Sequence, residues 1–187
     1  MSWQAPPAEP QPGPSGFVYA DVPNRAIAYV IDIVILAVVN IVVGIVLAAV
    51  GLSILGGSIL TGFSVNYFAV VVYGLVGLVI SAGYFIFTWT SMRATVGMRV
   101  LGMQIGNEVD GATLTQNQAV RRWLAVGGWI SIVQIINPVP LLGVLVGIVG
   151  LTYVIYLLYT TAQSPTKQGY HDHFAHTMVV KATRSVA

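Results

Sequence analysis

The stretch RAIAYVID, residues 25–32, points to the fold class because it places two opposite charges in a long apolar run. Arg25 and Asp32 are seven residues apart, nearly two helical turns, so they lie on one helix face about 10 Å apart along its axis. The apolar run continues to Val50, and no further charge occurs before Arg93. An acid inside a membrane-length apolar helix costs on the order of 2.5–3.5 kcal/mol on insertion scales, so Asp32 is expected to have a partner.

The composition indicates an integral membrane protein with one domain, which we expect in the cell (inner or plasma) membrane. Of the 187 residues 56% are hydrophobic and 7% are charged, whereas soluble domains carry roughly 25% charged residues. The basic residues flank apolar spans, so we expect the lipid bilayer as a partner and not nucleic acid. Because the chain has no cysteine, disulfides and thiolate chemistry are excluded.

The N-terminal residues 1–20 are predicted to be a disordered, Pro-rich tail. They have no basic region followed by an apolar core, so the tail does not look like a signal peptide. The first apolar span is therefore expected to act as an uncleaved anchor. Residues 183–187 are predicted to be a short C-terminal tail.

Apolar segments at about 25–50, 67–89, 116–136 and 141–160 predict an all-α bundle with four membrane crossings. The last two segments belong to one run that Asn137-Pro138-Val139-Pro140 interrupts. Four crossings place every basic residue on one side, so the positive-inside rule predicts cytoplasmic N- and C-termini. Three crossings would instead place the basic C-terminal tail outside.

The connections between the spans carry weaker signals. The uncharged, Gly- and Ser-rich segment 51–66 suggests an interfacial loop. Alternating apolar residues around Met103, with a turn signal at Asp110-Gly111, predict a small cytoplasmic β-hairpin. Residues 177–180 suit a short strand that could pair with it. The small pair Gly77 and Ser81 either packs inside the bundle or faces another subunit.

Three stretches together resemble the RDD family of membrane proteins. RAIAYVID supplies Arg25 and Asp32, which match the Arg and first Asp for which the family is named. The loop RATVGMRVLGMQI, with Thr95, Gly97 and Arg99, resembles the family's Thr-x-Gly-Lys-Arg motif. HDHFAHTMVV resembles the family's His-Asp tail and makes Asp172, next to His171, the candidate second acid.

The resemblance covers about residues 24–180 and implies an RDD-like transmembrane domain over residues 21–182. Ion transport has been suggested for some members of the family. The chain departs from the family pattern at Met98, where a Lys is usual, and at Gln168, where a basic residue often precedes the His-Asp pair.

The predicted functional residues are an intramembrane charge cluster. We expect Asp32 to pair with Arg25 and with Arg121 or Arg122, which enter the membrane from the same side. Such a cluster either fixes helix packing or serves as a proton or cation relay, in which Asp32 titrates with help from Asn40 and Asp172 gates the path.

The sequence suggests neither an enzyme nor a cofactor. His171, His173 and His176 are of the types that bind metals, but three histidines beside a membrane are more often solvated or hydrogen-bonded. No arrangement typical of nucleophilic catalysis or phosphate binding stands out.

Two classes of function remain. The first is a non-enzymatic accessory or scaffold subunit of a larger, transport-related membrane complex, with other membrane proteins or a second copy as partners. The second is a small cation/proton antiporter with Asp32 as its titrating site. Few deep polar groups and the absence of an obvious discontinuous helix favour the first.

Overall fold

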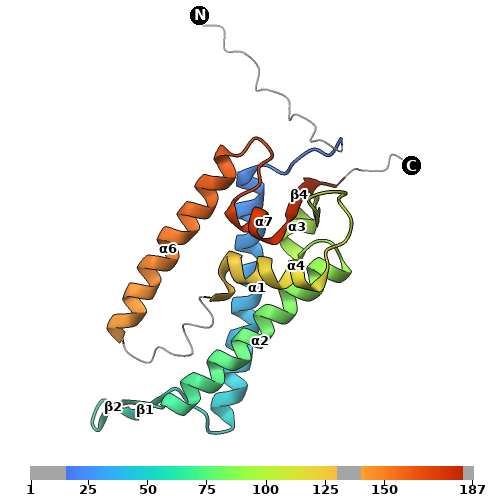
Figure 1. Cartoon of the computed structure of the whole chain (residues 1–187). Helices are drawn as coiled ribbons and strands as arrows, with labels where there is room; N and C mark the ends of the chain where they lie inside the picture. The colour runs from blue at the N-terminus through green and yellow to red at the C-terminus, as the bar shows by residue number, and fades with distance from the viewer. Residues whose placement is uncertain (1–15, 130–139, 183–187) are drawn as a thin grey trace, which may run out of the picture.

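The computed structural model describes residues 16–129 and 140–182, and its long axis is set by three helices (Figure 1). These are α1 (Val22–Ala49), α2 (Tyr67–Ser91) and α6 (Pro140–Gln163). Within the described residues, three helical segments are long and apolar enough to cross a membrane: Val22–Ala49, Tyr67–Ser91 and Val144–Gln163. They correspond to three of the four predicted spans.

Local sequence explains where these helices begin. Asp21 precedes α1, and Pro23 lies in its first turn, where a missing N–H has no helical partner to lose. Asn66 caps α2 by accepting a hydrogen bond from the Ala69 backbone N–H at 3.1 Å. In the most apolar windows of α1, α2 and α6 only 11%, 6% and 17% of residues are buried. Apolar surface exposed to this extent requires lipid or another protein around it.

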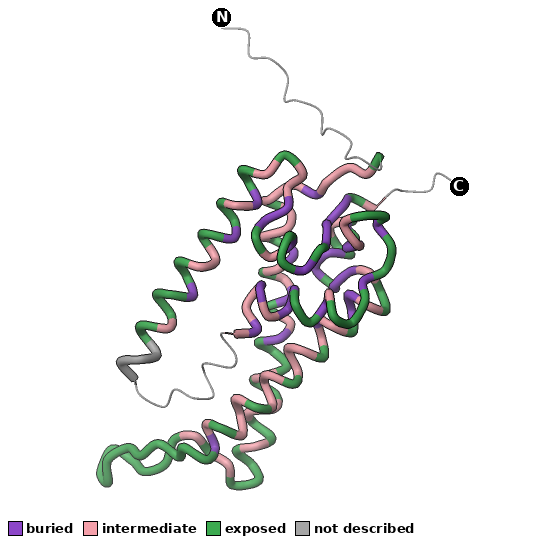
Figure 2. The backbone as a smooth tube through the Cα atoms, in the orientation of Figure 1, coloured by how far each residue is buried: buried purple, intermediate pink, exposed green. Residues whose placement is uncertain are grey.

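The short elements gather at one end of the long helices and form a unit that we call the cap (Figure 1). Figure 2 shows that the buried residues concentrate there, while the far ends of the long helices are mostly exposed. The fully buried side chains of the cap include Met103, Ile105, Met178 and Val179. The elements of the cap are α3 (Val96–Val100), β3 (Met103–Asn107), α4 (Gln116–Trp123), η1 (Leu124–Gly128), α7 (Tyr170–Ala175) and β4 (Thr177–Lys181).

The strand pairing in the cap joins distant parts of the chain. β3 pairs antiparallel with β4, with Met103 opposite Lys181 and Asn107 opposite Thr177. The predicted pairing of the C-terminal strand with the 90–122 loop is therefore confirmed, but the predicted local hairpin within that loop is wrong. Asp110-Gly111 does turn the chain, with Gly111 at a φ of 70°, yet the chain after it leads into α4 instead of a second strand.

The segment before α1 also joins this sheet. Tyr19 forms an antiparallel bridge with Val180, and the Ala20 backbone N–H donates to the Val179 carbonyl at 3.0 Å. Ala20 is buried. Residues 1–15, most of the predicted disordered tail, lie outside the described residues, as do residues 183–187 of the predicted C-terminal tail.

The segment predicted as a loop at 51–66 contains a hairpin. β1 (Leu55–Ser58) and β2 (Gly62–Val65) pair antiparallel at the end of the molecule opposite the cap (Figure 1). Gly57 and Gly62 supply positive φ angles beside the turn. The loop prediction was wrong because both strands are fully exposed, so there was no buried face to give the sequence an alternating pattern.

The third predicted span, 116–136, is described only as far as Trp129. Its start is confirmed, because α4 begins at Gln116 and Thr115 and Gln118 form a capping box there. α4 belongs to the cap and passes into the π-helical turn η1. The predicted turn at residues 137–140 lies outside the described residues except for Pro140, where α6 begins.

The small residues of α2 pack inside the molecule. A Cβ added at Gly77 would lie 3.2 Å from Asn40 Oδ1 of α1, and Ser81 Oγ accepts a hydrogen bond from Trp123 Nε1 at 3.1 Å. Of the two roles predicted for this pair, packing inside the bundle is therefore the one that the contacts support.

Candidate functional site

Asp32 is buried, as the cost of an acid at this depth requires, but its partners are not arginines. Its Oδ1 accepts hydrogen bonds from the Tyr84 hydroxyl at 2.7 Å and from the Gly97 backbone N–H at 2.9 Å. The predicted pairing of Asp32 with arginine is wrong because a backbone amide and a phenol on neighbouring elements satisfy the carboxylate first.

The loop motif brings that backbone amide to Asp32. Thr95 is buried and caps α3 by accepting from the Met98 backbone N–H at 3.1 Å. Gly97 then lies so close to α1 that an added Cβ would come 2.1 Å from the Ala28 carbonyl oxygen. Arg99, the third residue of the motif, is exposed, and its Nη2 makes only a long hydrogen bond of 3.5 Å to the Met92 carbonyl. Thr95 and Gly97 therefore fix α3 against α1.

Asp172 is the carboxylate that the arginines share. It is fully buried, and its Oδ2 accepts from Arg25 Nη1 at 2.8 Å while its Oδ1 accepts from Arg122 Nη1. The Gly169 backbone N–H also donates to Oδ2, at 3.0 Å. Arg122 Nη1 reaches Thr177 Oγ1 at 2.5 Å. The buried cluster is therefore Arg25, Asp172, Arg122 and Thr177.

Arg25 links three parts of the chain. Besides Asp172, its Nε donates to the Ala20 carbonyl and its Nη2 to the Val179 carbonyl, both at 3.0 Å. Arg121, which the sequence placed in the cluster with Arg122, is exposed. The prediction of a buried arginine cluster was thus correct for two arginines and assigned them to the wrong acid.

Burial and charge set the protonation states at Asp172 and His171. Burial alone would raise the pKa of Asp172, but Arg122, His171 and Arg25 outweigh it and hold this pKa far below its usual range. Burial lowers the pKa of His171 to about 4, against the opposing effect of the Asp172 carboxylate. His171 is therefore neutral at pH 7, with Nε2 3.4 Å from Asp172 Oδ2.

The other histidines lie on the surface of the cap. His173 is exposed, and His176 Nδ1 lies 2.6 Å from Glu108 Oε1. In the described part of the chain no three His, Asp or Glu side chains come together as metal ligands would.

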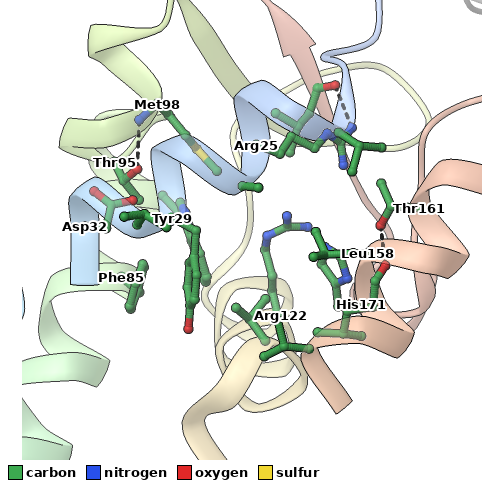
Figure 3. Close-up of a pocket in the computed structure, with 18 residues that line it drawn as sticks. Arg25, Tyr29, Asp32, Phe85, Thr95, Met98, Arg122, Leu158, Thr161 and His171 are labelled. Carbon is green, nitrogen blue, oxygen red and sulfur yellow. Dashed lines mark hydrogen bonds between the residues drawn. The ribbon is translucent and has the colours of Figure 1, made fainter. Parts of the chain in front are cut away.

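A cavity of about 220 Å³ lies beside the arginine cluster (Figure 3). Its walls come mainly from α1 and α6, with further residues from α2, α3, α4, η1, α7 and β4. Figure 3 shows the Arg122 side chain beside the cavity, with His171 on one side of it and Asp32 across from His171. Both predicted acids thus lie at or next to one cavity, although they do not share an arginine.

A family model matches the chain over most of its length, from residue 19 to residue 176, and its description is "RDD family". The chain belongs to the RDD family. RDD proteins are membrane proteins, which agrees with the apolar helices seen here. No curated protein and no solved structure matches the chain.

In this RDD protein the residues that resemble the family's named Arg, Asp and Asp make two separate sets of contacts. Arg25 and Asp172 form an ion pair between α1 and α7, and Asp32 holds the start of α3. Sequence reasoning missed Tyr84, Thr177 and Trp89 as parts of the site. Tyr84 and Trp89 are aromatic residues of an apolar span, where such residues are common, and Thr177 was noticed only as part of the HDHFAHTMVV stretch.

Proposed function

We propose that this RDD protein is a non-enzymatic accessory or scaffold subunit of a larger, transport-related membrane complex. The observation that carries the proposal is that the buried charged side chains of the site are bound by other parts of the protein. Asp172 is held by Arg25 and Arg122, so that the ion pairs join α1, α4 and α7. Asp32 is held by Tyr84 and a backbone amide. These charges have structural partners, as expected of groups that fix one arrangement of a small bundle.

The outer faces of the long helices provide the surface that such a subunit needs. Val79 of α2 and Leu151 of α6 are 69% and 64% exposed. A Cβ added at Gly83 or Gly147 would meet nothing within 4 Å, so these small residues leave room for a close helix neighbour.

Site-specific photocrosslinking in the native membrane tests this proposal. A photoreactive amino acid at Val79 or Leu151 is expected to give one protein adduct of constant mass, identified by mass spectrometry. The same residue at Ile59, an exposed position in the hairpin turn opposite the cap, serves as the control. Adducts with lipid alone at both helix positions, together with a free monomer in mild detergent, would contradict the proposal.

We also propose four crossings of the cell membrane with both termini in the cytoplasm. α1 runs away from the cap, whereas α2 and α6 both run toward it (Figure 1). Two helices that run in the same direction need a return of the chain between them. The described basic residues lie at the cap end, which the positive-inside rule assigns to the cytoplasm.

The alternative is a cation/proton antiporter, and one observation favours it: Asp32 lines the cavity. Arg25 and Arg122 line the same cavity, so that an entering cation would meet two positive charges. Proteoliposomes with an imposed sodium or potassium gradient decide between the candidates. We expect no proton movement above that of empty vesicles, and movement that Asp32→Asn abolishes would establish the antiporter instead.

A further inference from the structure

The cavity beside the arginine cluster is lined by both polar and apolar side chains. The polar side chains nearest the cluster are Arg25, Arg122, Thr161 and His171. The apolar walls are formed by side chains of two membrane-length helices, Val22, Ala26 and Val30 of α1 and Val154, Leu157 and Leu158 of α6. At about 220 Å³ the space is several times the roughly 30 Å³ that a water molecule occupies in the liquid.

Three buried polar atoms beside this cavity have no hydrogen-bond partner among the described residues. They are Arg122 Nε, Trp89 Nε1 and His171 Nδ1. Arg122 and Trp89 are 3% and 2% exposed, and all three residues line the cavity. Native proteins rarely leave such groups unpaired, so these atoms mark the part of the cavity where a ligand could form hydrogen bonds.

The type of these atoms indicates the chemistry of the ligand. Arg122 Nε and Trp89 Nε1 both carry an N–H and can only donate, so the ligand must accept hydrogen bonds. The two groups are also neighbours, because Arg122 Cζ lies over the Trp89 ring, 5.4 Å from its centre.

The local charge favours an anion. Arg25 and Arg122 carry two positive charges, Asp172 neutralises one of them, and His171 is neutral at pH 7. Asp32 carries the other negative charge at the cavity, but Tyr29 stands between it and Arg122 in Figure 3, and the carboxylate is already hydrogen-bonded to Gly97 and Tyr84. The part of the cavity near Arg122 and His171 therefore suits an oxyanion.

We propose that this cavity is a binding site for an anionic phospholipid. Its phosphate accepts hydrogen bonds from Arg122 Nε and Trp89 Nε1, and part of an acyl chain lies between α1 and α6. A lipid fits better than a free anion because the walls on both sides belong to helices whose remaining surface is apolar and exposed. The site is independent of whether the chain works within a larger complex.

Native mass spectrometry of the full chain in detergent, titrated with phosphatidylglycerol, tests the proposal. We expect one lipid to be retained per chain, and Trp89→Phe to weaken its binding on the order of tenfold, because the variant lacks one donor to a charged oxygen. The matched control is Trp123→Phe. Trp123 is also buried, but its Nε1 donates to Ser81 and it does not line the cavity.

A second variant tests the apolar walls of the cavity. Ala26→Phe fills the space between α1 and α6 and is expected to abolish lipid retention while Asp172 keeps its arginines. Thermal unfolding and gel filtration of each variant show that it is folded. Equal weakening by Trp89→Phe and Trp123→Phe, equal retention of phosphatidylcholine, saturation by inorganic phosphate alone, or no retained lipid would each overturn the proposal.

Discussion

At the scale of single residues, the contact between Gly97 and α1 is among the narrowest in the described part of the chain. The Ala28 carbonyl oxygen leaves no room for a Cβ at residue 97, and the same glycine supplies the N–H that binds Asp32. Gly97, which the sequence analysis placed in a loop motif, thus packs closely against α1 and also donates a hydrogen bond to a buried acid.

Gly97→Ala is expected to lower the free energy of unfolding by roughly 3 kcal/mol, because α3 must move away from α1 and from Asp32. Gly83→Ala is the control, since its Cβ would meet open space and alanine is the better helix former by about 0.5–1 kcal/mol. Unfolding in mixed micelles measures both. Similar stability of the two variants would show that the contact is not tight.

Tyr84→Phe removes a hydrogen bond to a buried carboxylate and is expected to cost about 1.5–3 kcal/mol. Tyr73→Phe is the matched control. The Tyr73 hydroxyl donates to the neutral Gly44 carbonyl at 2.6 Å, so its loss should cost only about 0.5–1.5 kcal/mol. The same unfolding experiment measures the difference, and a larger loss in Tyr73→Phe would contradict the role given to Asp32.

At the scale of elements, the ion pairs of Asp172 hold α7 and β4 against α1 and α4. A double-mutant cycle with Arg25→Gln and Asp172→Asn is expected to show coupling of about 1–3 kcal/mol, with the Asp172 variant alone losing about 3–5 kcal/mol. The pair Lys181 and Asp21, half exposed and 4.0 Å apart, is the control and should show coupling below about 1 kcal/mol. If the losses of unfolding free energy in the Arg25 and Asp172 variants simply add, the two residues do not stabilise the protein as an ion pair.

His171 should make the stability of the cap depend on pH. Its pKa is about 4 in the folded protein and about 6.5 in the unfolded chain, so the unfolded chain binds more protons between these values. Stability is therefore complete above pH 6.5 and falls toward pH 4, by on the order of 3 kcal/mol in total. Asp172 loses its contribution only at lower pH, because its pKa lies below the usual range.

Thermal unfolding at pH 7, 6 and 5 measures this dependence. His171→Gln is expected to abolish most of it, whereas His173→Gln, a change at an exposed position of the same helix, should leave it intact. An equal pH dependence in both variants would assign it to other groups.

The elements also show what the sequence could and could not predict. Length and hydropathy located α1, α2 and α6 to within a few residues, because lipid demands a long apolar run whatever else the fold does. The pairing of β3 with β4 was foreseen only as a possibility, since a short strand does not specify a distant partner. Asp32 and Asp172 were both selected as site residues, yet the partners of Asp32 were not, because Tyr84 of α2 and the Gly97 amide of α3 come close to Asp32 only in the folded structure.

At the scale of the whole molecule, the cap and the β1–β2 hairpin lie at opposite ends. The chain has no natural cysteine, so that single cysteines report on each end without background. With a membrane-impermeant maleimide, Thr61→Cys in the hairpin turn is expected to react in intact cells. Lys167→Cys and Asp110→Cys in the cap should react only after permeabilisation. Labelling of Thr61 and Lys167 from the same side would reject the proposed topology.

The sheet in which Val180 meets Tyr19 has a consequence for biosynthesis. A ribosome makes the three apolar helices of the described residues before it reaches Asp172 and β4, so Arg25 and Arg122 are synthesised well before the carboxylate that pairs with them. The ion pairs of the cap can therefore form only after the apolar helices have been synthesised. A polypeptide stopped after Gln163 would keep the described apolar helices but lack the carboxylate that joins Arg25 to Arg122 and the strand that meets Tyr19.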